Sequence, residues 1–374
     1  MTEIDTQRPP GLLLIRADAS SEIGIGHVMR TLALAQAWQD QGGRVLYLMA
    51  PPPEALKQRL LRASCALRLL EPHAADDPMQ VLLTARVLGA VACVVDGYAF
   101  DASYQQILTE AGLPVLWIDD EAHAAPYTAP VILNQNPHAT PRAYPERPDH
   151  ATLLLGLRHA LLRREFAQAQ PLAEVPDGAP RVVVTFGGSD AAGLTQTAWE
   201  TLHAARILHP DLKADLILGS AYAGPEAWLH DVEATSWATV HRAVEDLVPL
   251  LRPATVALAA AGSTTWELAR LGVPSLLLTV APNQQPIAQA AEKAGIAWTL
   301  GEVGDLDSGM LARVLTDALT ELLGDPSAQA TMRAAGPPLV DGGGAQRVVE
   351  ALLQVIATDP YGLHAESQPA GLRA

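Results

Sequence analysis

A histidine stands where an apolar run near the start of the chain gives way to a helical pattern. The run LLLI at 12–15 predicts a buried strand, residues 18–26 are turn-forming, and apolar residues recur at helical spacing after His27. Ligands of open parallel sheets bind where strands are followed by helices. His27 is therefore the first candidate for a chemical role.

The position of His27 suits a general base. The positive end of a helix dipole disfavours imidazolium and leaves a neutral ring that accepts a proton. Gly24 and Gly26 let the backbone approach a ligand and leave free amides at the helix start. The structural alternative is a histidine that caps the helix or packs at a domain edge. Because Met29 occupies the last position of a G-x-G-x-x-G fingerprint, the pattern does not favour NAD.

Several acidic residues follow predicted strands in the same half of the chain. Asp18, Asp96 and the pair Asp119–Asp120 stand at the carboxyl ends of strands, the edge where open α/β sheets bind ligands. A carboxylate that accepts from the second ring nitrogen of His27 would fix its tautomer. For each Asp, the alternative is a helix cap or a turn. Arg30, one helical turn after His27, is expected to neutralise phosphate or hold a carboxylate, or else to be a solvated helix residue.

A glycine pair follows the first predicted strand of the second half. The stretch TFGGSDAAG places Gly187, Gly188 and Ser189 between a strand and a helix, which predicts a cradle for a pyrophosphate. An ordinary tight turn is the alternative. The stretch lacks the lysine of a P-loop, so nucleotide hydrolysis of the ATPase kind is not indicated.

A second loop of this half, AGSTTWE, opens another predicted helix. Gly262 and Ser263 precede a helix start at Thr264, and Glu267 lies in the first turn. An acidic residue there suits the helix dipole, which is the structural interpretation. It is also suited to accept hydrogen bonds from two ribose hydroxyls, as carboxylates do in nucleotide sites.

Three neutral amides follow the next predicted strand. Asn283, Gln284 and Gln285 stand at the same edge of the predicted sheet as the two loops above. Amide side chains suit sugar hydroxyls and acetamido groups, because each both donates and accepts hydrogen bonds. A polar loop is the alternative.

Length and pattern predict two α/β domains. The chain has 374 residues, of which 49% are hydrophobic and 18% charged, enough to fill two cores. Strand-like runs alternate with helical runs, which predicts βαβ units and parallel sheets, hence two doubly wound Rossmann-like domains. The expected strands are 11–17, 44–49, 91–95, 114–118, 131–133, 181–186, 214–218, 256–260, 275–280 and 296–300, and the expected helices include 27–41, 54–63, 78–88, 102–111 and 194–206.

The boundary between the domains is expected in a linker-like stretch at 165–180. An N-terminal sugar-binding and catalytic domain then covers 1–165, and a nucleotide-binding domain covers 181–340. A helix at 341–358 is expected to return to the first domain, and 359–374 are expected to form a flexible tail.

Charge and cysteine content limit the possible partners. The formal net charge of −16 disfavours nucleic acid and anionic lipid, since both carry phosphate. Cys65 and Cys93 stand in no metal or redox spacing, which favours a reduced, cytoplasmic setting. The start of the chain has no signal-peptide pattern, and no apolar run approaches the roughly 20 residues that span a bilayer. We expect a soluble protein with no stable membrane association, no metal and no cofactor; the oligomeric state stays open.

The order of these motifs resembles a known enzyme family. The chain shows x-R-x-D-x-S-x-x-I-G-x-G-H-x-x-R, then G-G-S-D, A-G-S-T-T-x-E and N-Q-Q. This series resembles the UDP-sugar hydrolases of pseudaminic acid biosynthesis, which release UDP from UDP-2,4-diacetamido-2,4,6-trideoxy-β-L-altropyranose. The second half is also similar to the N-acetylglucosaminyltransferase that makes lipid II, which has the glycosyltransferase B fold. This resemblance implies two Rossmann-like domains that face a cleft. The residues that match the hydrolases are Arg16, Asp18, Ser20, Ile23, Gly24, Gly26, His27, Arg30, 132–136, 161–166, 187–190, 262–267 and 341–349.

The resemblance implies a division of the substrate between two sets of residues. On the nucleotide side, the glycine pair would face the diphosphate and Glu267 the ribose, in a set made of Gly187, Gly188, Ser189, Gly262, Ser263, Thr264 and Glu267. The sugar side would comprise Asp18, Gly26, Arg30, Asp96, Tyr98, Asn283, Gln284 and Gln285. Family members usually show a basic or polar residue after the Asp of the fourth strand, whereas Gly97 and Tyr98 follow Asp96 here.

The mechanism implied is hydrolysis of a small-molecule UDP-sugar. His27 would take a proton from water, which attacks the anomeric carbon and inverts its configuration as UDP leaves. Three alternatives stay open. One is a glycosyltransferase that uses a UDP-sugar donor, with residues 54–70 supplying an apolar patch edged by cations for a lipid acceptor. The others are a 2-epimerase of UDP-N-acetylhexosamine and a protein that only binds nucleotide sugars.

Overall fold

A computed structural model describes residues 10–358 apart from 21–22, 73, 173, 175–177, 191, 220 and 223. The expected tail at 359–374 lies outside the described residues, as do residues 1–9 and part of the linker-like stretch. The described residues divide into two compact units, one within 10–20, 25–163 and 344–358 and the other within 23–24 and 164–343. The chain thus passes from the first unit to the second between Arg163 and Arg164.

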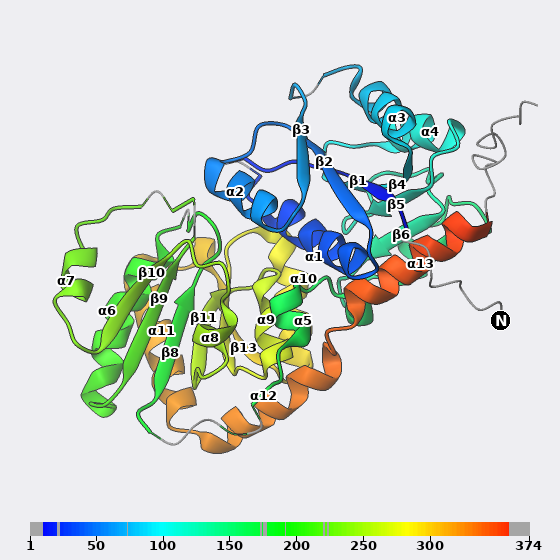
Figure 1. Cartoon of the computed structure of the whole chain (residues 1–374). Coiled ribbons are helices and arrows are strands. Elements are labelled where there is room, and N and C mark those ends of the chain that lie inside the picture. The colour runs from blue at the N-terminus through cyan, green and yellow to red at the C-terminus, as the bar shows by residue number, and fades with distance from the viewer. Residues whose placement is uncertain are drawn as a thin grey trace, which may run out of the picture. The chain divides into compact units, whose positions relative to one another are not determined.

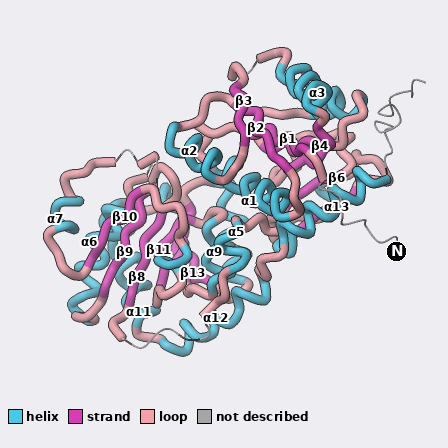
Figure 2. Tube along the Cα trace, viewed as in Figure 1, coloured by secondary structure: helices cyan, strands magenta, loops and turns pink. Residues whose placement is uncertain are grey.

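The first unit is built on a parallel sheet of seven strands (Figures 1 and 2). The strand order is β3-β2-β1-β4-β5-β6-β7, and every neighbouring pair is parallel. The strands are β1 (Leu12–Ala17), β2 (Arg44–Met49), β3 (Ala66–Leu69), β4 (Ala90–Asp96), β5 (Val115–Ile118), β6 (Val131–Asn134) and β7 (Thr152–Leu155). The helices are α1 (Gly26–Asp40), α2 (Glu54–Arg62), α3 (Asp77–Leu88), α4 (Ala102–Glu110) and α13 (Gly344–Thr358), with short 3-10 turns η1 (Pro141–Ala143) and η2 (Leu157–His159).

Both faces of this sheet are buried, as a doubly wound fold requires. Along β1, Leu13 and Ile15 pack into a core on the side of α1, α2 and α13. Leu12 and Leu14 pack into a second core on the side of α3 and α4. Successive side chains of a strand point to opposite faces, so the uninterrupted run LLLI fills both cores at once.

Helix α13, the last described element, belongs to the first unit. α13 packs against α1, and Arg347 Nη1 donates to the carbonyl of Arg158 at 2.7 Å. Gly344 begins the helix in very close contact with the backbone of Ala160, since an added Cβ would lie 2.2 Å from the Ala160 carbonyl oxygen. Only glycine fits at that position.

The second unit is built on a parallel sheet of six strands in the order β10-β9-β8-β11-β12-β13 (Figures 1 and 2). The strands are β8 (Arg181–Thr185), β9 (Lys213–Leu218), β10 (Ala238–Arg242), β11 (Val256–Ala260), β12 (Ser275–Thr279) and β13 (Ala297–Glu302). The helices are α5 (Arg164–Gln168), α6 (Leu194–Leu208), α7 (Leu229–Glu233), α8 (Val248–Leu251), α9 (Thr264–Leu271), α10 (Gln285–Lys293), α11 (Ser308–Leu323) and α12 (Pro326–Leu339), with 3-10 turns η3 (Pro282–Gln284) and η4 (Val303–Asp305).

The two sheets share one topological feature that decides where ligands bind. In each, the strand order reverses beside the first strand, between β1 and β4 in one unit and between β8 and β11 in the other. Open α/β sheets bind ligands outside the carboxyl ends of the strands at such a switch point. The predicted strands and helices are present, and the fold class is confirmed. The edge strands β3, β7 and β10 were not among the expected strands, because each has only four or five residues, too few for the hydrophobic pattern to identify a strand.

Candidate functional site

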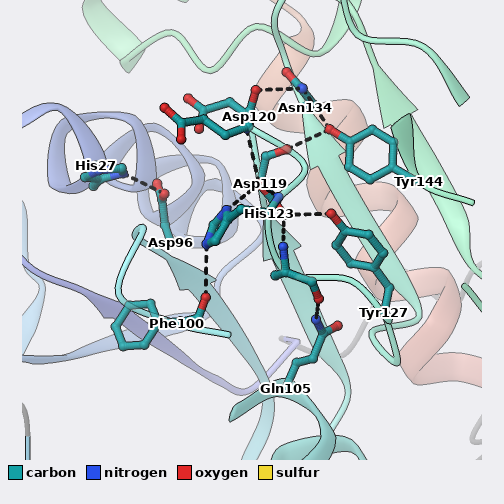
Figure 3. A network of polar contacts seen from close by, with 12 residues as sticks. His27, Asp96, Phe100, Gln105, Asp119, Asp120, His123, Tyr127, Asn134 and Tyr144 are labelled. Carbon is teal, nitrogen blue, oxygen red and sulfur yellow. Dashed lines mark hydrogen bonds and ion pairs between the residues drawn. The ribbon is translucent and has the colours of Figure 1, made fainter. Parts of the chain in front are cut away.

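His27 lies at the switch point of the first unit, in the first turn of α1. The side chain is 8% exposed, and its Nδ1 lies 2.8 Å from Oδ1 of Asp96, the last residue of β4 (Figure 3). A carboxylate can only accept, so Nδ1 carries the hydrogen in this pair. Nε2 of the neutral ring is then the proton acceptor.

Arg30 fixes the carboxylate that orients His27. Its Nε and Nη2 donate to the two oxygens of Asp96, each at 2.6 Å, and its Nη1 donates to Asp120 Oδ2 at 2.6 Å. Nη2 also lies 3.1 Å from His27 Nδ1, and since both atoms then carry hydrogens, this contact is not a hydrogen bond. One guanidinium thus holds two carboxylates from the ends of neighbouring strands, a bidentate pairing that arginine favours.

These contacts set the ionisation of the acidic groups. Burial of Asp96 raises its pKa, but the charge and hydrogen bonds of Arg30, together with His27, outweigh burial and hold the pKa below its usual range. The same balance of burial against Arg30 lowers the pKa of Asp120. Burial alone would lower the pKa of Arg30, yet the two carboxylates hold it well above the usual value. At neutral pH, the Arg30 guanidinium is therefore a cation that lies between two carboxylate anions.

Tyr98 lies against His27 on the loop that follows β4. The ring centroids are 4.8 Å apart with an interplanar angle of 81°, an edge contact, and Tyr98 is 41% exposed. Tyr98 also hydrogen-bonds the Asp120 side chain, which contributes to the low pKa of that carboxyl. The structure thus brings together five predicted residues of the first unit, His27, Arg30, Asp96, Tyr98 and Asp120.

Other acidic candidates lie elsewhere. Both oxygens of Asp18 accept from Arg16, at 2.6 and 2.8 Å, and Oδ1 also accepts from the Ala50 amide at 2.7 Å. Asp119 is 1% exposed and accepts from backbone amides of the loop that follows β5. Among the candidates for orienting His27, the structure selects Asp96. Asp119 makes the turn contacts that were its alternative, whereas Asp18 forms an ion pair with Arg16 and accepts from the distant Ala50 amide, which is neither a helix cap nor a local turn.

The glycine loop of the second unit ends β8 at the other switch point. Among the described residues, none accepts a hydrogen bond from the backbone amides of Gly187, Gly188 or Ser189. Asp190 instead caps α6. Its Oδ1 accepts from the Leu194 amide and its Oδ2 from the Thr195 amide, both at 2.9 Å. An anion at this loop would meet the loop amides, because the end of α6 already carries a carboxylate.

A glycine that the sequence analysis did not single out shapes this loop. A Cβ added to Gly219, just after β9, would lie 2.3 Å from the carbonyl oxygen of Gly188 and 2.5 Å from that of Gly187. No other residue fits there without moving the loop. A lone glycine after a strand gives no sign of such a contact in the sequence.

The second loop of this unit follows β11 and begins α9. Ser263 precedes the helix without a side-chain cap, and Glu267 lies in the first turn, as predicted. Gln284 belongs to the turn after β12, and its Nε2 lies 4.0 Å from the position of a Cβ on Gly262. Its Oε1 accepts from the Val280 amide at 3.0 Å, so the side-chain oxygen already forms a hydrogen bond within its own turn.

The remaining predicted residues of the second unit are accessible. Asn283 and Gln285 are exposed, as is Ser263, while Thr264 is half-buried at the start of α9. Gly26 is the first residue of α1 in the first unit, and the helix lacks a side-chain cap. The roles of these residues in binding stay predictions.

The network around Asp120 contains residues that sequence reasoning missed. Asn134 Nδ2 lies 3.3 Å from the Asp120 carbonyl oxygen and 2.8 Å from the Tyr144 hydroxyl, which donates to the Asp119 carbonyl at 2.7 Å (Figure 3). His123 contacts Asp119 through Nδ1 at 2.9 Å. Asn134 stands at the end of a predicted strand and within the 132–136 match to the hydrolases, but it was given no role, and the sequence carried no signal for His123 or Tyr144.

In the part of the chain that the structure describes, no group of three or more His, Cys, Asp and Glu side chains is placed to hold a metal ion. Within the same residues, no helix has both the length and the apolar character needed to cross a membrane.

Comparison with known proteins gives distant relatives. No family model matches the chain. It is 25% identical over 354 residues to the spore coat polysaccharide biosynthesis protein SpsG of Bacillus subtilis, covering 91% of this chain and 97% of that protein. It is 26% identical over 159 residues to the UDP-2,4-diacetamido-2,4,6-trideoxy-β-L-altropyranose hydrolase of Campylobacter jejuni, covering 42% of this chain and 53% of the hydrolase.

Solved structures resemble the chain over nearly its whole length. MurG of Acinetobacter baumannii superposes with a TM-score of 0.57 at 15% identity and covers 94% of this chain and 100% of its own. The spinosyn rhamnosyltransferase SpnG complexed with thymidine diphosphate superposes with a TM-score of 0.59 at 18% identity and covers 93% of this chain and 99% of its own. With its two parallel α/β sheets, the chain therefore has the glycosyltransferase B fold.

Proposed function

We propose that this chain is an enzyme that cleaves nucleotide sugars between the anomeric carbon and the diphosphate, with His27 as the general base. The observation that carries the proposal is the pair of His27 and Asp96 at the switch point of the first sheet. Asp96 accepts from Nδ1 and leaves Nε2 as the proton acceptor, and Arg30 keeps Asp96 ionised. A base that is held in one tautomer is what proton abstraction from a hydroxyl requires.

The reaction is a single displacement. Nε2 of His27 takes the proton of an oxygen nucleophile as that oxygen forms a bond to the anomeric carbon. The bond between this carbon and the diphosphate oxygen breaks, and its electron pair leaves with the nucleoside diphosphate. Attack from the opposite face inverts the configuration of the sugar. Asp96 stabilises the imidazolium that forms, as a carboxylate does in other His–Asp pairs.

The second unit is assigned to the nucleotide. The amides of Gly187, Gly188 and Ser189 suit a diphosphate, and Glu267 suits the ribose hydroxyls. SpnG, which has the same fold, was solved with thymidine diphosphate, which supports a nucleoside diphosphate as the ligand. We propose UDP, because the hydrolase relative is named for a UDP-linked sugar.

The nucleophile distinguishes two candidate functions. Glycosyl transfer to a sugar hydroxyl is the better supported one, because SpnG is a rhamnosyltransferase and SpsG is named for polysaccharide biosynthesis. Hydrolysis, in which water is the nucleophile, is favoured by the likeness to the hydrolase, but that likeness covers 42% of this chain. Either function uses the same base and the same leaving group.

The test is UDP release from purified donors. UDP-N-acetylglucosamine and UDP-2,4-diacetamido-2,4,6-trideoxy-β-L-altropyranose are incubated with the protein alone, then with free N-acetylhexosamines or a bacterial polysaccharide as acceptor. Release that needs an acceptor indicates transfer, and release in its absence indicates hydrolysis. In oxygen-18 water, a hydrolase acting at carbon places the label in the sugar; label in UDP would contradict the mechanism.

His27→Asn provides the variant for this assay. Loss of a general base costs about 10²- to 10⁴-fold in turnover, whereas binding of UDP should be unchanged. His150→Asn, at an exposed histidine of the same unit, is the matched control. If the two variants and the wild type release UDP equally fast, His27 is not the base. If the wild type releases no UDP from any donor with any acceptor, the proposed function is wrong.

A further inference from the structure

The loop that follows β4 carries Tyr98 and is held from one side by a buried cation. Gly97 adopts a φ of 153°, and a Cβ there would lie 2.9 Å from the Phe100 ring. That ring covers the guanidinium of Arg16 at 4.8 Å from its centroid. Arg16 is 2% exposed and is itself fixed by two carboxylates, so it forms a rigid base for the loop.

His123 holds the same loop from the other side. Its Nε2 lies 3.1 Å from the carbonyl oxygen of Phe100, and its Nδ1 lies 2.9 Å from Asp119 Oδ1 (Figure 3). Both neighbours of the ring are acceptors, and only the Phe100 carbonyl belongs to the loop after β4. The ring therefore joins the loops after β4 and β5 when Nε2 carries a hydrogen and donates it to Phe100.

Asp119 gives His123 a fixed anchor. Its Oδ2 accepts from the Ala124 amide at 3.1 Å and from the Tyr127 hydroxyl at 2.7 Å, while Oδ1 faces His123. A carboxylate that is 1% exposed and has this many donors has little freedom to move. The position of the His123 ring is therefore set by the end of β5.

The ring of Tyr98 lies between two histidines. Its centroid is 4.8 Å from that of His27 and 6.0 Å from that of His123, with edge contacts at 81° and 70°. Any shift of the loop between 97 and 100 therefore changes the contact of Tyr98 with His27. His123 limits this shift through the carbonyl of Phe100 and through the Tyr98 ring.

We propose that His123 is a positioning residue for the base: it holds the loop after β4 so that the Tyr98 ring packs against His27. The proposal rests on the function proposed above, because it takes His27 as the reacting group. His123 itself needs no contact with substrate. His123 affects the reaction through Tyr98 alone, so its effect on turnover should disappear when Tyr98 is replaced.

The consequence is tested by a double-mutant cycle on turnover. His123→Asn and Tyr98→Leu are each expected to lower kcat by about 10- to 100-fold, the size of effect that a displaced reacting group produces, with little change in the Kd for UDP. If His123 acts through Tyr98, the double variant turns over about as fast as Tyr98→Leu alone. Losses that multiply in the double variant would overturn the proposal, as would a His123→Asn enzyme with normal kcat.

Two further variants guard against a folding defect. His123→Gln supplies an amide N–H donor on a longer side chain than Asn, closer to the place of the ring Nε2, and is expected to recover part of the turnover lost in His123→Asn. His150→Asn removes an exposed histidine of the same unit and should change nothing. Thermal unfolding of each variant shows whether the fold is kept. If His123→Asn does not fold, the cycle is run with His123→Gln, and multiplying losses overturn the proposal in the same way.

A readout without substrate separates this inference from the proposed function. In carbon-13 spectra of histidine-labelled protein, the signal of the His27 ring is assigned by its loss in His27→Asn. We expect it to move in His123→Asn and in Tyr98→Leu and to stay in place in His150→Asn. An unmoved signal in His123→Asn refutes the positioning role. A moved signal in a chain that cleaves no nucleotide sugar refutes the proposed function while keeping the contact.

Discussion

Asp96→Asn is the most informative single change, because it keeps the shape of the side chain while it removes the negative charge and replaces one acceptor by a donor. Asp96 accepts from His27 at 2.8 Å and from Arg30 at two positions, both 2.6 Å. An amide offers one oxygen in place of two. When that oxygen stays on Arg30, the amide nitrogen faces His27 Nδ1 and donates to it. The hydrogen of the ring then moves to Nε2, the atom that must act as base.

The expected loss of kcat is the loss that follows when the base is held in the wrong tautomer. The loss of a general base costs about 10²- to 10⁴-fold in kcat, which corresponds to about 2.7 to 5.4 kcal/mol at 1.36 kcal/mol per tenfold. The change also removes one of the two negative partners of Arg30. Breaking a buried ion pair costs about 3–5 kcal/mol, and the remaining partner, Asp120, should keep the cost near the lower end.

The assay is initial-rate UDP release at saturating donor, with UDP binding measured by calorimetry and stability by denaturant unfolding. The chain contains a matched control, because Asp215 of β9 also stands between a histidine and an arginine. His241 Nε2 lies 2.7 Å from one of its oxygens, and Arg181 donates to the other. Asp215→Asn should lower stability and leave kcat unchanged. If Asp96→Asn kept kcat within about threefold of wild type, the assignment of His27 as an oriented base would be wrong.

Three other changes test separate parts of the site. Glu267→Ala should weaken UDP binding by about 1.5–3 kcal/mol, the usual size for hydrogen bonds to a charged group, and calorimetry showing an unaltered Kd would remove Glu267 from the ribose site. Gly219→Ala should displace the loop at 187–188 and weaken UDP binding while His27 is untouched; a crystal structure with the loop unmoved would contradict this. Because the folded pKa of Asp96 is held below its usual value, Asp96 stabilises the fold above about pH 4, its unfolded pKa, and this contribution is lost as pH falls through the lower folded pKa. The free energy of unfolding should therefore fall less steeply with decreasing pH in Asp96→Asn than in wild type. Equal slopes for the two proteins at low pH would contradict this contribution of Asp96.

Local pattern was enough to predict the fold. Apolar runs such as LLLI and VVV are buried on both faces in parallel sheets, and helical spacing between them implies crossovers. The turn before α1 was also predicted from its glycines. Gly24 adopts a φ of 74°, a value that other residues rarely take. These features depend on neighbours within a few residues, so the amino-acid sequence by itself determined them.

Pairing among the polar residues was decided by the tertiary structure. Four carboxylates stood at strand ends, and their sequence positions did not say which one meets His27. Asp96 does so across 69 residues and Asp120 meets Arg30 across 90, because the reversal of strand order sets β4 directly beside β1 and β5 beside β4. His123 and Gly219 were missed for the same reason. Their roles depend on contacts between loops that only the order of the strands brings together. The residues next to a side chain in the sequence do not indicate that order.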